Sequence, residues 1–315
     1  MEYHPSGVSV TAPVSPAIER VKQILFCPFD LGKWFAIGFC AWLAYLGQGG
    51  YNYHRSASGK SHSSIDLGPV RTYVHEHLTW IIPLAIGVFV IIVATTVLFL
   101  WLRSRGAFMF LHCVVLNRGE VAVPWRKFER EASSLWRFKL VLAMLGAVLV
   151  LPIIGAAVWI FVQMYLRSQH FDSSKILLLV VLGVAWLCIG LPLSVAEIFT
   201  THFVAPIMYL RSCTCTDGWR ILFLLLSANP ARFILYVLFQ IVIGFVILLL
   251  GIGFVLCTCC VGGLLLIIPY IGSVVRLPVT VFLRSYSLLY LAQYGPEFDV
   301  FRAEETPGTD PSPAA

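Results

Sequence analysis

Long apolar segments alternate along the chain with shorter segments in which apolar and charged residues are interleaved. A transmembrane helix needs roughly 20 mostly apolar residues to cross a hydrocarbon core of about 30 Å. Runs of this kind predict six transmembrane helices. The six runs are Lys33–Gln48, Trp80–Leu102, Leu140–Leu166, Ile176–Thr201, Phe233–Leu256 and Val261–Leu283.

The first and the fourth runs depart from the usual length of a span. The first is short, and Trp34 and Trp42 would hold its ends at the two membrane interfaces. The fourth remains apolar as far as Leu210, which is too long for one straight span. We therefore expect it to kink or to change direction at Pro192 and Pro206.

Three of the intervening segments have the pattern of helices at the membrane interface. One begins at Ser15-Pro16 and another at Pro124, since Ser caps helices and Pro suits their first turn. A third, Trp219–Leu226, is apolar nearly all round and too short to span, so we expect it to be re-entrant or packed under the bundle. The inward faces of the first two helices comprise Ile18, Val21, Leu25, Trp125, Phe128, Ala132 and Leu135. Arg126, Lys127 and Arg130 lie elsewhere on the second helix and are candidates for contact with anionic lipid.

Composition supports a membrane protein and excludes other classes. Of 315 residues, 59% are hydrophobic and 12% charged, with a mean hydropathy of +0.85. A soluble domain is about 45–50% apolar and about 25% charged, so a soluble, disordered or nucleic-acid-binding protein is not expected. Most Lys and Arg residues fall on the side of the six spans that holds both termini. The positive-inside rule then places both termini in the cytoplasm.

A short motif suggests an internal repeat. The triplet Leu-Arg-Ser closes three of the predicted spans, at Leu102–Ser104, Leu210–Ser212 and Leu283–Ser285. A further copy at Leu166–Ser168 ends the third span on the opposite side, so chance contributes. We interpret the chain as three copies of an interfacial helix followed by a transmembrane hairpin.

Two stretches carry a family resemblance. Phe29–Phe39 (FDLGKWFAIGF), and Phe203–Arg211 (FVAPIMYLR) followed by Trp219-Arg220, resemble an uncharacterised family of bacterial multi-pass membrane proteins. The arrangement is also similar to the membrane domain attached to some glycerophosphodiester phosphodiesterases. The chain has no room for the soluble phosphodiesterase barrel, so the resemblance implies a membrane domain and no hydrolase. It supplies no catalytic residues.

Glu197, His202 and Arg276 are the candidate residues for a polar site inside the membrane. A charge at the bilayer centre is costly and usually faces the bundle interior with a partner. A Glu197–Arg276 pair could bind an anionic group or relay protons, with His202 near the depth of Arg276. The alternatives are a purely structural pair, or a fourth helix that ends early and leaves Glu197 at the interface.

Histidine and cysteine clusters suggest metal sites only weakly. The first external loop contains four histidines, but its many serines are more typical of a solvated loop; the four are His54, His62, His75 and His77. Two cysteine clusters resemble a zinc set, but the predicted topology separates them by the thickness of the membrane, and each alone is short of four ligands. They are Cys213 with Cys215, and Cys257 with Cys259 and Cys260. We expect no metal site and no cofactor, and the oxidation state of the second cluster stays open.

The sequence therefore predicts an all-α bundle of six transmembrane helices, arranged as three hairpins within residues 15–295. Residues 1–14 and the acidic, Pro-rich tail 296–315 are expected to be disordered. We expect a non-enzymatic protein of the cell membrane that organises or binds lipids or a membrane-protein partner, without nucleic acid. The alternative is a small transporter or channel that uses the intramembrane polar residues.

Overall fold

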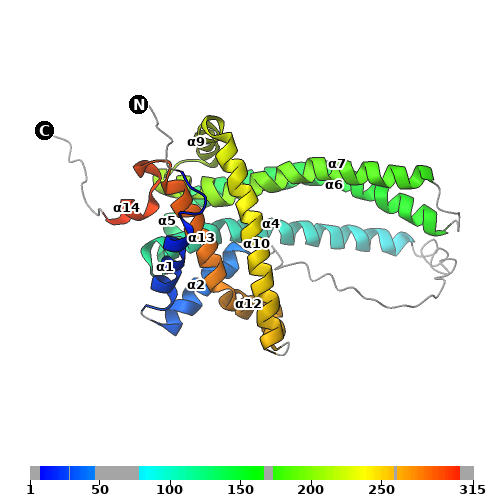
Figure 1. The fold of residues 1–315 in the computed structure, drawn as a ribbon. Coiled ribbons are helices and arrows are strands. Elements are labelled where there is room, and N and C mark those ends of the chain that lie inside the picture. The colour runs from blue at the N-terminus through cyan, green and yellow to red at the C-terminus, as the bar shows by residue number, and fades with distance from the viewer. Residues whose placement is uncertain (1–7, 28, 47–77, 167–172, 259–260, 306–315) are drawn as a thin grey trace.

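The computed structural model is all-helical in the parts of the chain that it describes, residues 8–27, 29–46, 78–166, 173–258 and 261–305 (Figure 1). The first half comprises α1 (Val14–Leu25), α2 (Leu31–Ala44), α4 (Leu78–Leu116), α5 (Ala122–Lys127), α6 (Glu129–Leu166) and α7 (Ser173–Phe199). The second half comprises a π-helix η1 (Thr200–Val204), α8 (Ala205–Arg211), α9 (Cys215–Ala228), α10 (Pro230–Cys257), α11 (Val261–Ile267), α12 (Pro269–Val275), α13 (Leu277–Ala292), a 3-10 turn η2 (Pro296–Phe298) and α14 (Val300–Glu305).

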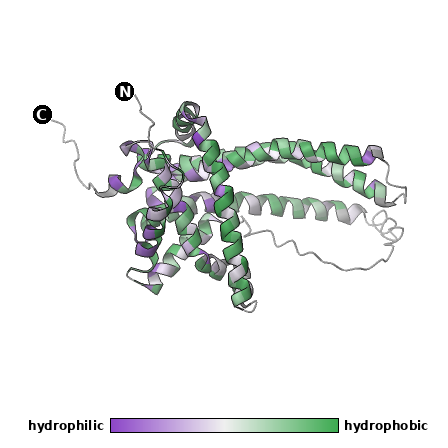
Figure 2. Cartoon of the chain, in the orientation of Figure 1, coloured by the Kyte–Doolittle hydropathy of each residue, from purple (hydrophilic) through white to green (hydrophobic). Residues whose placement is uncertain are grey.

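The molecule divides into a packed head and three projecting arms (Figures 1 and 2). The arms are residues 78–102 of α4, 141–166 of α6 and 173–198 of α7, and their described side chains are largely exposed and apolar. An arm of about 25 residues is about 37 Å long, enough to cross a bilayer core of about 30 Å. Within the described residues, four helices are long and apolar enough to span a membrane: α4, α6, α7 with its continuation into α8, and α10. This arrangement is that of a membrane protein.

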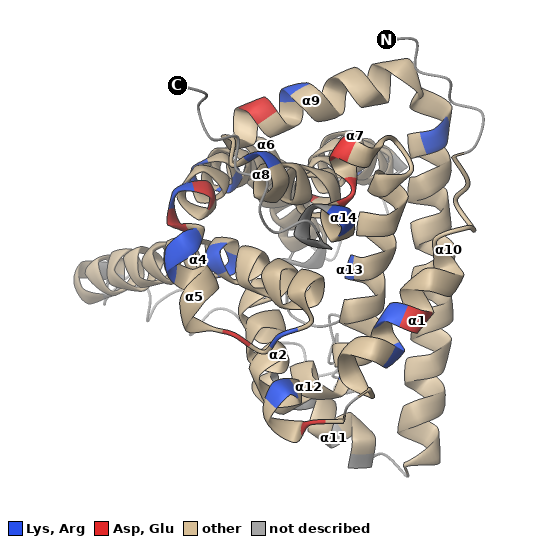
Figure 3. Cartoon of the chain, turned by 90° about the vertical axis from the view of Figure 1, so that its left-hand side faces the viewer, with Lys and Arg blue, Asp and Glu red and all other residues tan. Residues whose placement is uncertain are grey.

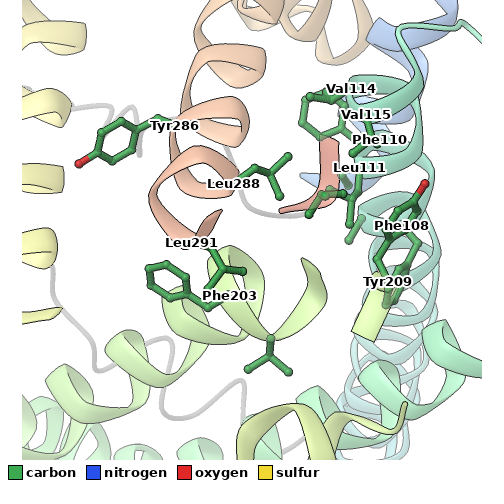
Figure 4. Packing of buried hydrophobic residues seen from close by; sticks show 14 of the residues in the cluster. Phe108, Phe110, Leu111, Val114, Val115, Phe203, Tyr209, Tyr286, Leu288 and Leu291 are labelled. Carbon is green, nitrogen blue, oxygen red and sulfur yellow. The ribbon is translucent and has the colours of Figure 1, made fainter. Parts of the chain in front are cut away.

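The head is built on the inner half of α4. Residues 104–115 of this helix are buried on every side, including the polar residues Ser104, Arg105 and His112. Phe108 and Leu111 of α4 pack in one cluster with Phe203 of η1 and with Leu288 and Leu291 of α13 (Figure 4). The rest of the head is α1, α2, α5, α8, α14 and the first turns of α6, grouped around this cluster.

The structure changes the predicted boundaries of the first three spans. The helix at Lys33–Gln48 is α2, whose 14 residues extend about 21 Å, less than a bilayer core. The second helix does not end at the Leu102–Ser104 triplet but continues to Leu116. The third begins at Glu129, so the predicted interfacial helix is divided: its first part is the separate helix α5, and its second part is continuous with the span that follows.

The predicted sixth span, Val261–Leu283, is not a single helix. It is divided into α11, α12 and α13, and Pro269 and Pro278 stand in the first turns of the last two. The chain folds back tightly at Gly272, where a Cβ atom would lie 2.5 Å from the carbonyl oxygen of Leu266. Because α12 packs against α2 in the head, this segment contributes no continuous transmembrane helix, and six spans are not found.

The fifth span is present as α10, but it does not run with the others. Figure 1 shows α10 crossing the direction of the arms beside the head. Aromatic rings fix its first turns there: Tyr236 lies 4.7 Å from Tyr290 and 4.8 Å from Phe203, and Phe233 lies 5.3 Å from Tyr294, measured between ring centroids. These contacts join α10 to η1 and α13.

The fourth span changes its helical register where a kink was expected. Pro192 lies within α7 without interrupting it, whereas η1 directly precedes Pro206. In η1 the N–H of Ala205 donates to the carbonyl of Thr200, five residues back. The next residue, Pro206, has no N–H to donate, so the backbone cannot supply the corresponding hydrogen bond to the carbonyl of Thr201.

The short helices follow the predicted pattern with one exception. Phe128, Ala132 and Leu135 are buried as expected, and α9 ends at Ala228 with Asn229 as its C-cap. In α1, however, Ile18 is 44% exposed, whereas Ala17, Ile24 and Leu25 are buried. The inward face of α1 is therefore rotated from the predicted one, and the helix begins at Val14, before Ser15.

Parts of the two terminal segments expected to be disordered are folded. Ser9 exchanges hydrogen bonds with Gln293 of α13, from its N–H to Oε1 (2.8 Å) and from Nε2 to its carbonyl (3.1 Å). Val10, Phe298 and Val300 are buried in the head. Residues 8–13 and 296–305 thus belong to the folded unit because their apolar side chains cover its core.

Replacing Phe203 by Ala should destabilise the protein by about 3–5 kcal/mol, because it leaves a cavity among the rings of η1, α10 and α13. Phe89→Ala is the matched control, since Phe89 is 64% exposed on an arm whereas Phe203 is fully buried. Thermal unfolding in mild detergent measures both. Equal losses in the two variants would contradict this account of the core.

Candidate functional site

Three basic side chains from separate helices meet in the head, around a small cavity. Arg103 comes from α4, Lys139 from α6 and Arg284 from α13, and we call them the cationic cluster. Tyr45, at the end of α2, and Thr201 of η1 also line this cavity. The cluster lies where the arms of α4 and α6 enter the head.

The cluster is buried and rich in positive charge. Lys139 and Arg284 are 4% and 5% exposed, and the side chain of Arg103 is 11% exposed. Among the described residues one carboxylate forms an ion pair with the cluster, that of Glu197, whose Oε1 lies 2.6 Å from Nη2 of Arg103. Two of the three cations therefore have no carboxylate partner in the described part of the chain.

Arg284 is held by the irregular backbone of η1. Its Nη1 donates a 2.5 Å hydrogen bond to the carbonyl of Thr201, the group to which Pro206 cannot donate. An unpaired buried carbonyl costs about 1–3 kcal/mol, so this contact stabilises the register change. It also fixes the guanidinium of α13 at the centre of the head.

Lys139 is positioned by its helix. It lies on the face of α6 that also buries Leu135 and Ala132, whereas Arg137, two residues earlier, is exposed. The charged groups of Arg103, Arg284 and Glu197 all lie close enough to the Lys139 ammonium to interact with it electrostatically. Lys139 makes no hydrogen bond to any residue that the structure describes.

The residues predicted to form an intramembrane site do not meet. Glu197 pairs with Arg103 and not with Arg276, which instead donates to the carbonyl of Leu266 (3.1 Å). His202 hydrogen-bonds through Nδ1 to the hydroxyl of Tyr236 (2.8 Å). The predicted pairing is wrong because the sixth segment is broken, which places Arg276 at the junction of α12 and α13.

The model of one family, described as a family of unknown function (DUF7544), matches residues 8–301. The chain belongs to this family. No curated protein and no solved structure matches the chain. Membership confirms the expectation of an uncharacterised family, but nothing found links the chain to the glycerophosphodiester phosphodiesterase membrane domain.

In this DUF7544 protein, the Leu-Arg-Ser triplets are the signal that could have identified two members of the cluster. Arg103 and Arg284 are the central residues of the first and third triplets. The second triplet behaves differently, because Arg211 is exposed and lies 5.3 Å from the ring centroid of Phe298. Lys139 belongs to no triplet, and only the packing of α6 reveals its burial.

Arg126, Lys127 and Arg130 are exposed, as predicted, and we call them the basic surface. Their supporting helix is fixed to α4 by Arg105, which forms an ion pair with Glu129 (2.7 Å) and lies over the rings of Trp101 and Trp125. The basic surface therefore projects from a rigid part of the head.

The metal-site candidates remain apart or lie outside the described residues. All four loop histidines (His54, His62, His75 and His77) lie outside them, as do Cys259 and Cys260. Burial raises the pKa of the Cys215 thiol to about 12. No group of three or more His, Cys, Asp and Glu residues suited to a metal occurs in the described ranges.

A double-mutant cycle should reveal the coupling between Arg284 and Pro206. Arg284→Met removes the donor to Thr201, whereas Pro206→Ala restores a backbone N–H that can replace it. We expect Arg284→Met to destabilise the wild type by about 1–3 kcal/mol more than it destabilises the Pro206→Ala variant. Reversible unfolding in mixed micelles measures the difference.

Arg276→Met is the control for this cycle. Arg276 also donates to a carbonyl, but to that of Leu266, which does not depend on Pro206. Its effect should be additive with Pro206→Ala. If the effects of Arg284→Met and Pro206→Ala were also additive, the hydrogen bond from Arg284 to Thr201 would not compensate for the N–H that Pro206 lacks.

Proposed function

We propose that this protein is a non-enzymatic integral membrane protein that binds anionic lipid headgroups through the basic surface, and that it organises lipid or a membrane partner in this way. The observation that carries the proposal is the exposure of Arg126, Lys127 and Arg130 together at one corner of a charged head whose arms are apolar. Figure 3 displays the Lys and Arg residues of the head, including those on α5.

Local packing supports this role for the basic surface. Phe128 and Leu135 face the core, and the rings of Trp101 and Trp125 hold Arg105. The three basic residues stay exposed on this support, and the ammonium of Lys127 lies 5.4 Å from the ring centroid of Phe128. Long basic side chains presented this way attract anionic headgroups, each contributing about 1 kcal/mol near a charged surface.

The direction of the arms indicates where the basic surface would lie relative to the membrane. With the arms in the hydrocarbon core, the head occupies one face of the membrane, and both ends of the described chain are in the head (Figure 1). The excess of Lys and Arg on this side favours the cytoplasmic face of the cell membrane. That face carries the anionic lipids to which a basic surface would bind.

A transporter or channel is the weaker proposal. Glu197, His202 and Arg276 each bind a different partner, so the described residues provide no single path through these three side chains. The observation that favours this alternative is the cationic cluster, which places polar groups at the entry of two arms into the head.

Replacing Arg126, Lys127 and Arg130 together by Gln should reduce retention of phosphatidylglycerol. At about 1 kcal/mol, or roughly five-fold, for each charge, the total loss is about a hundred-fold in affinity at low salt. Native mass spectrometry from mixed micelles of phosphatidylglycerol and phosphatidylcholine measures the lipid that stays bound. The loss should shrink as salt is added, because screening weakens exposed charges.

The matched control is Lys22→Gln, Arg220→Gln and Arg302→Gln. These residues are also exposed and lie on α1, α9 and α14, so the control removes the same charge without altering the basic surface. It should retain phosphatidylglycerol as the wild type does. If both triple variants behave alike, the basic surface has no special role in lipid binding.

A further inference from the structure

We propose that the cationic cluster of Arg103, Lys139 and Arg284 is a binding site for one small inorganic anion of halide size, held in the cavity between the three side chains. This site is separate from the basic surface and does not depend on the proposed lipid binding. It assigns a ligand to residues that the lipid-binding proposal leaves without a role.

The charge of the cluster calls for an anion. Three cations and one carboxylate, that of Glu197, leave an excess of positive charge in the apolar head. Each unpaired charge removed from water carries a penalty of several kcal/mol unless a counter-charge is close. The Glu197 carboxylate is already bound to Arg103 and its side chain is 40% exposed, so this one carboxylate leaves the cluster with a net positive charge.

Two of the residues that line the cavity carry hydrogen-bond donors without an acceptor among the described residues. Nε of Arg284 is buried and has no hydrogen-bond partner among the described residues. The ammonium of Lys139 likewise has none there, although Lys139 lines the cavity. A buried donor without an acceptor is costly, and an anion in the cavity would accept from both groups.

The size of the cavity selects the class of anion. It has room for about one water-sized molecule, whereas a phosphate or a lipid headgroup would require the surrounding helices to separate. A halide is a single atom, larger than water but much smaller than a phosphate. It also accepts hydrogen bonds from any direction, which suits donors that arrive from three different helices.

A bound halide would stabilise the joint between the head and the arms. Arg103, Lys139 and Arg284 lie on α4, α6 and α13, and repulsion between their charges opposes the packing of these helices. An anion at their centre replaces repulsion by attraction. Since such a ligand binds the folded state alone, the midpoint of unfolding should rise with its concentration.

The test uses the full chain in mild detergent, with sodium gluconate replaced stepwise by sodium chloride or sodium bromide at constant ionic strength. We expect a saturable rise in the midpoint of thermal unfolding with either halide. We also expect broadening of the chloride-35 NMR line, which bromide reverses by competition. Lys139→Gln should weaken halide affinity by about ten-fold to a hundred-fold.

Arg137→Gln is the matched control, because this exposed Arg lies two residues from Lys139 on the same helix. It should retain the halide response, as should the triple Gln variant of the basic surface. If Lys139→Gln fails to fold, the wild-type protein still tests the proposal, because a specific site requires that bromide displace chloride in the titration.

Three outcomes would overturn the proposal. The first is an unfolding midpoint that does not distinguish chloride from gluconate. The second is loss of the halide response in Arg137→Gln or in the basic-surface variant, which would place the anion on the exterior. The third is stabilisation by phosphate but not by chloride or bromide, which would assign the cluster to an oxyanion.

Discussion

The hydrogen bond from Arg284 to the carbonyl of Thr201 is the contact on which the arrangement of the head depends. Pro206 has no N–H, and the π-helical turn before it leaves that carbonyl without a backbone donor. Arg284 of α13 donates to this carbonyl. The contact holds a guanidinium in the centre of the head and joins α13 to η1. Tyr290 of α13 in turn packs against Phe233 and Tyr236, which joins α10 to the same region.

The buried charges explain why the head is polar at the point where the arms leave it. In a membrane protein, an ionisable side chain in an apolar region usually marks a binding or transport site, since lipid makes it costly. Arg103 is partly compensated by Glu197, one turn before η1, so α4 and α7 are joined at the level where their exposed apolar surfaces begin. Arg284 and Lys139 are more deeply buried and line the cavity, so a ligand there would compensate their charges. The proposed anion site therefore lies at the level where the apolar arms leave the head.

Local sequence patterns predicted the positions of most helices well, but they predicted poorly which helices pack against one another. Apolar runs identified the arms, α10 and part of α9, and Ser15-Pro16 and Pro124 marked the starts of α1 and α5 to within two residues, because these features depend on neighbouring residues alone. The predicted sixth span failed for a different reason. Its apolar composition is compatible with a span, but Pro269, the close approach at Gly272 and Pro278 turn it back onto α2. Arg276 moved with that segment, so the pairing with Glu197 could not be inferred from depth. The Leu-Arg-Ser triplets marked Arg103 and Arg284, but nothing in the local sequence separates buried Lys139 from exposed Arg137.

The exposed surface of the arms requires a partner that the described chain does not supply. Large side chains such as Phe89, Val148 and Leu177 are more than half exposed, and α10, which might have covered them, is held across the head by Phe203, Tyr236 and Tyr290. Contiguous apolar patches of this extent do not occur on soluble monomers. Lipid can cover arms of this length without further protein. Figure 1 shows α10 crossing the direction of the arms, so the four helices that are long and apolar enough to span a membrane do not share one direction, and the exposed apolar side chains of α10 need a cover of their own.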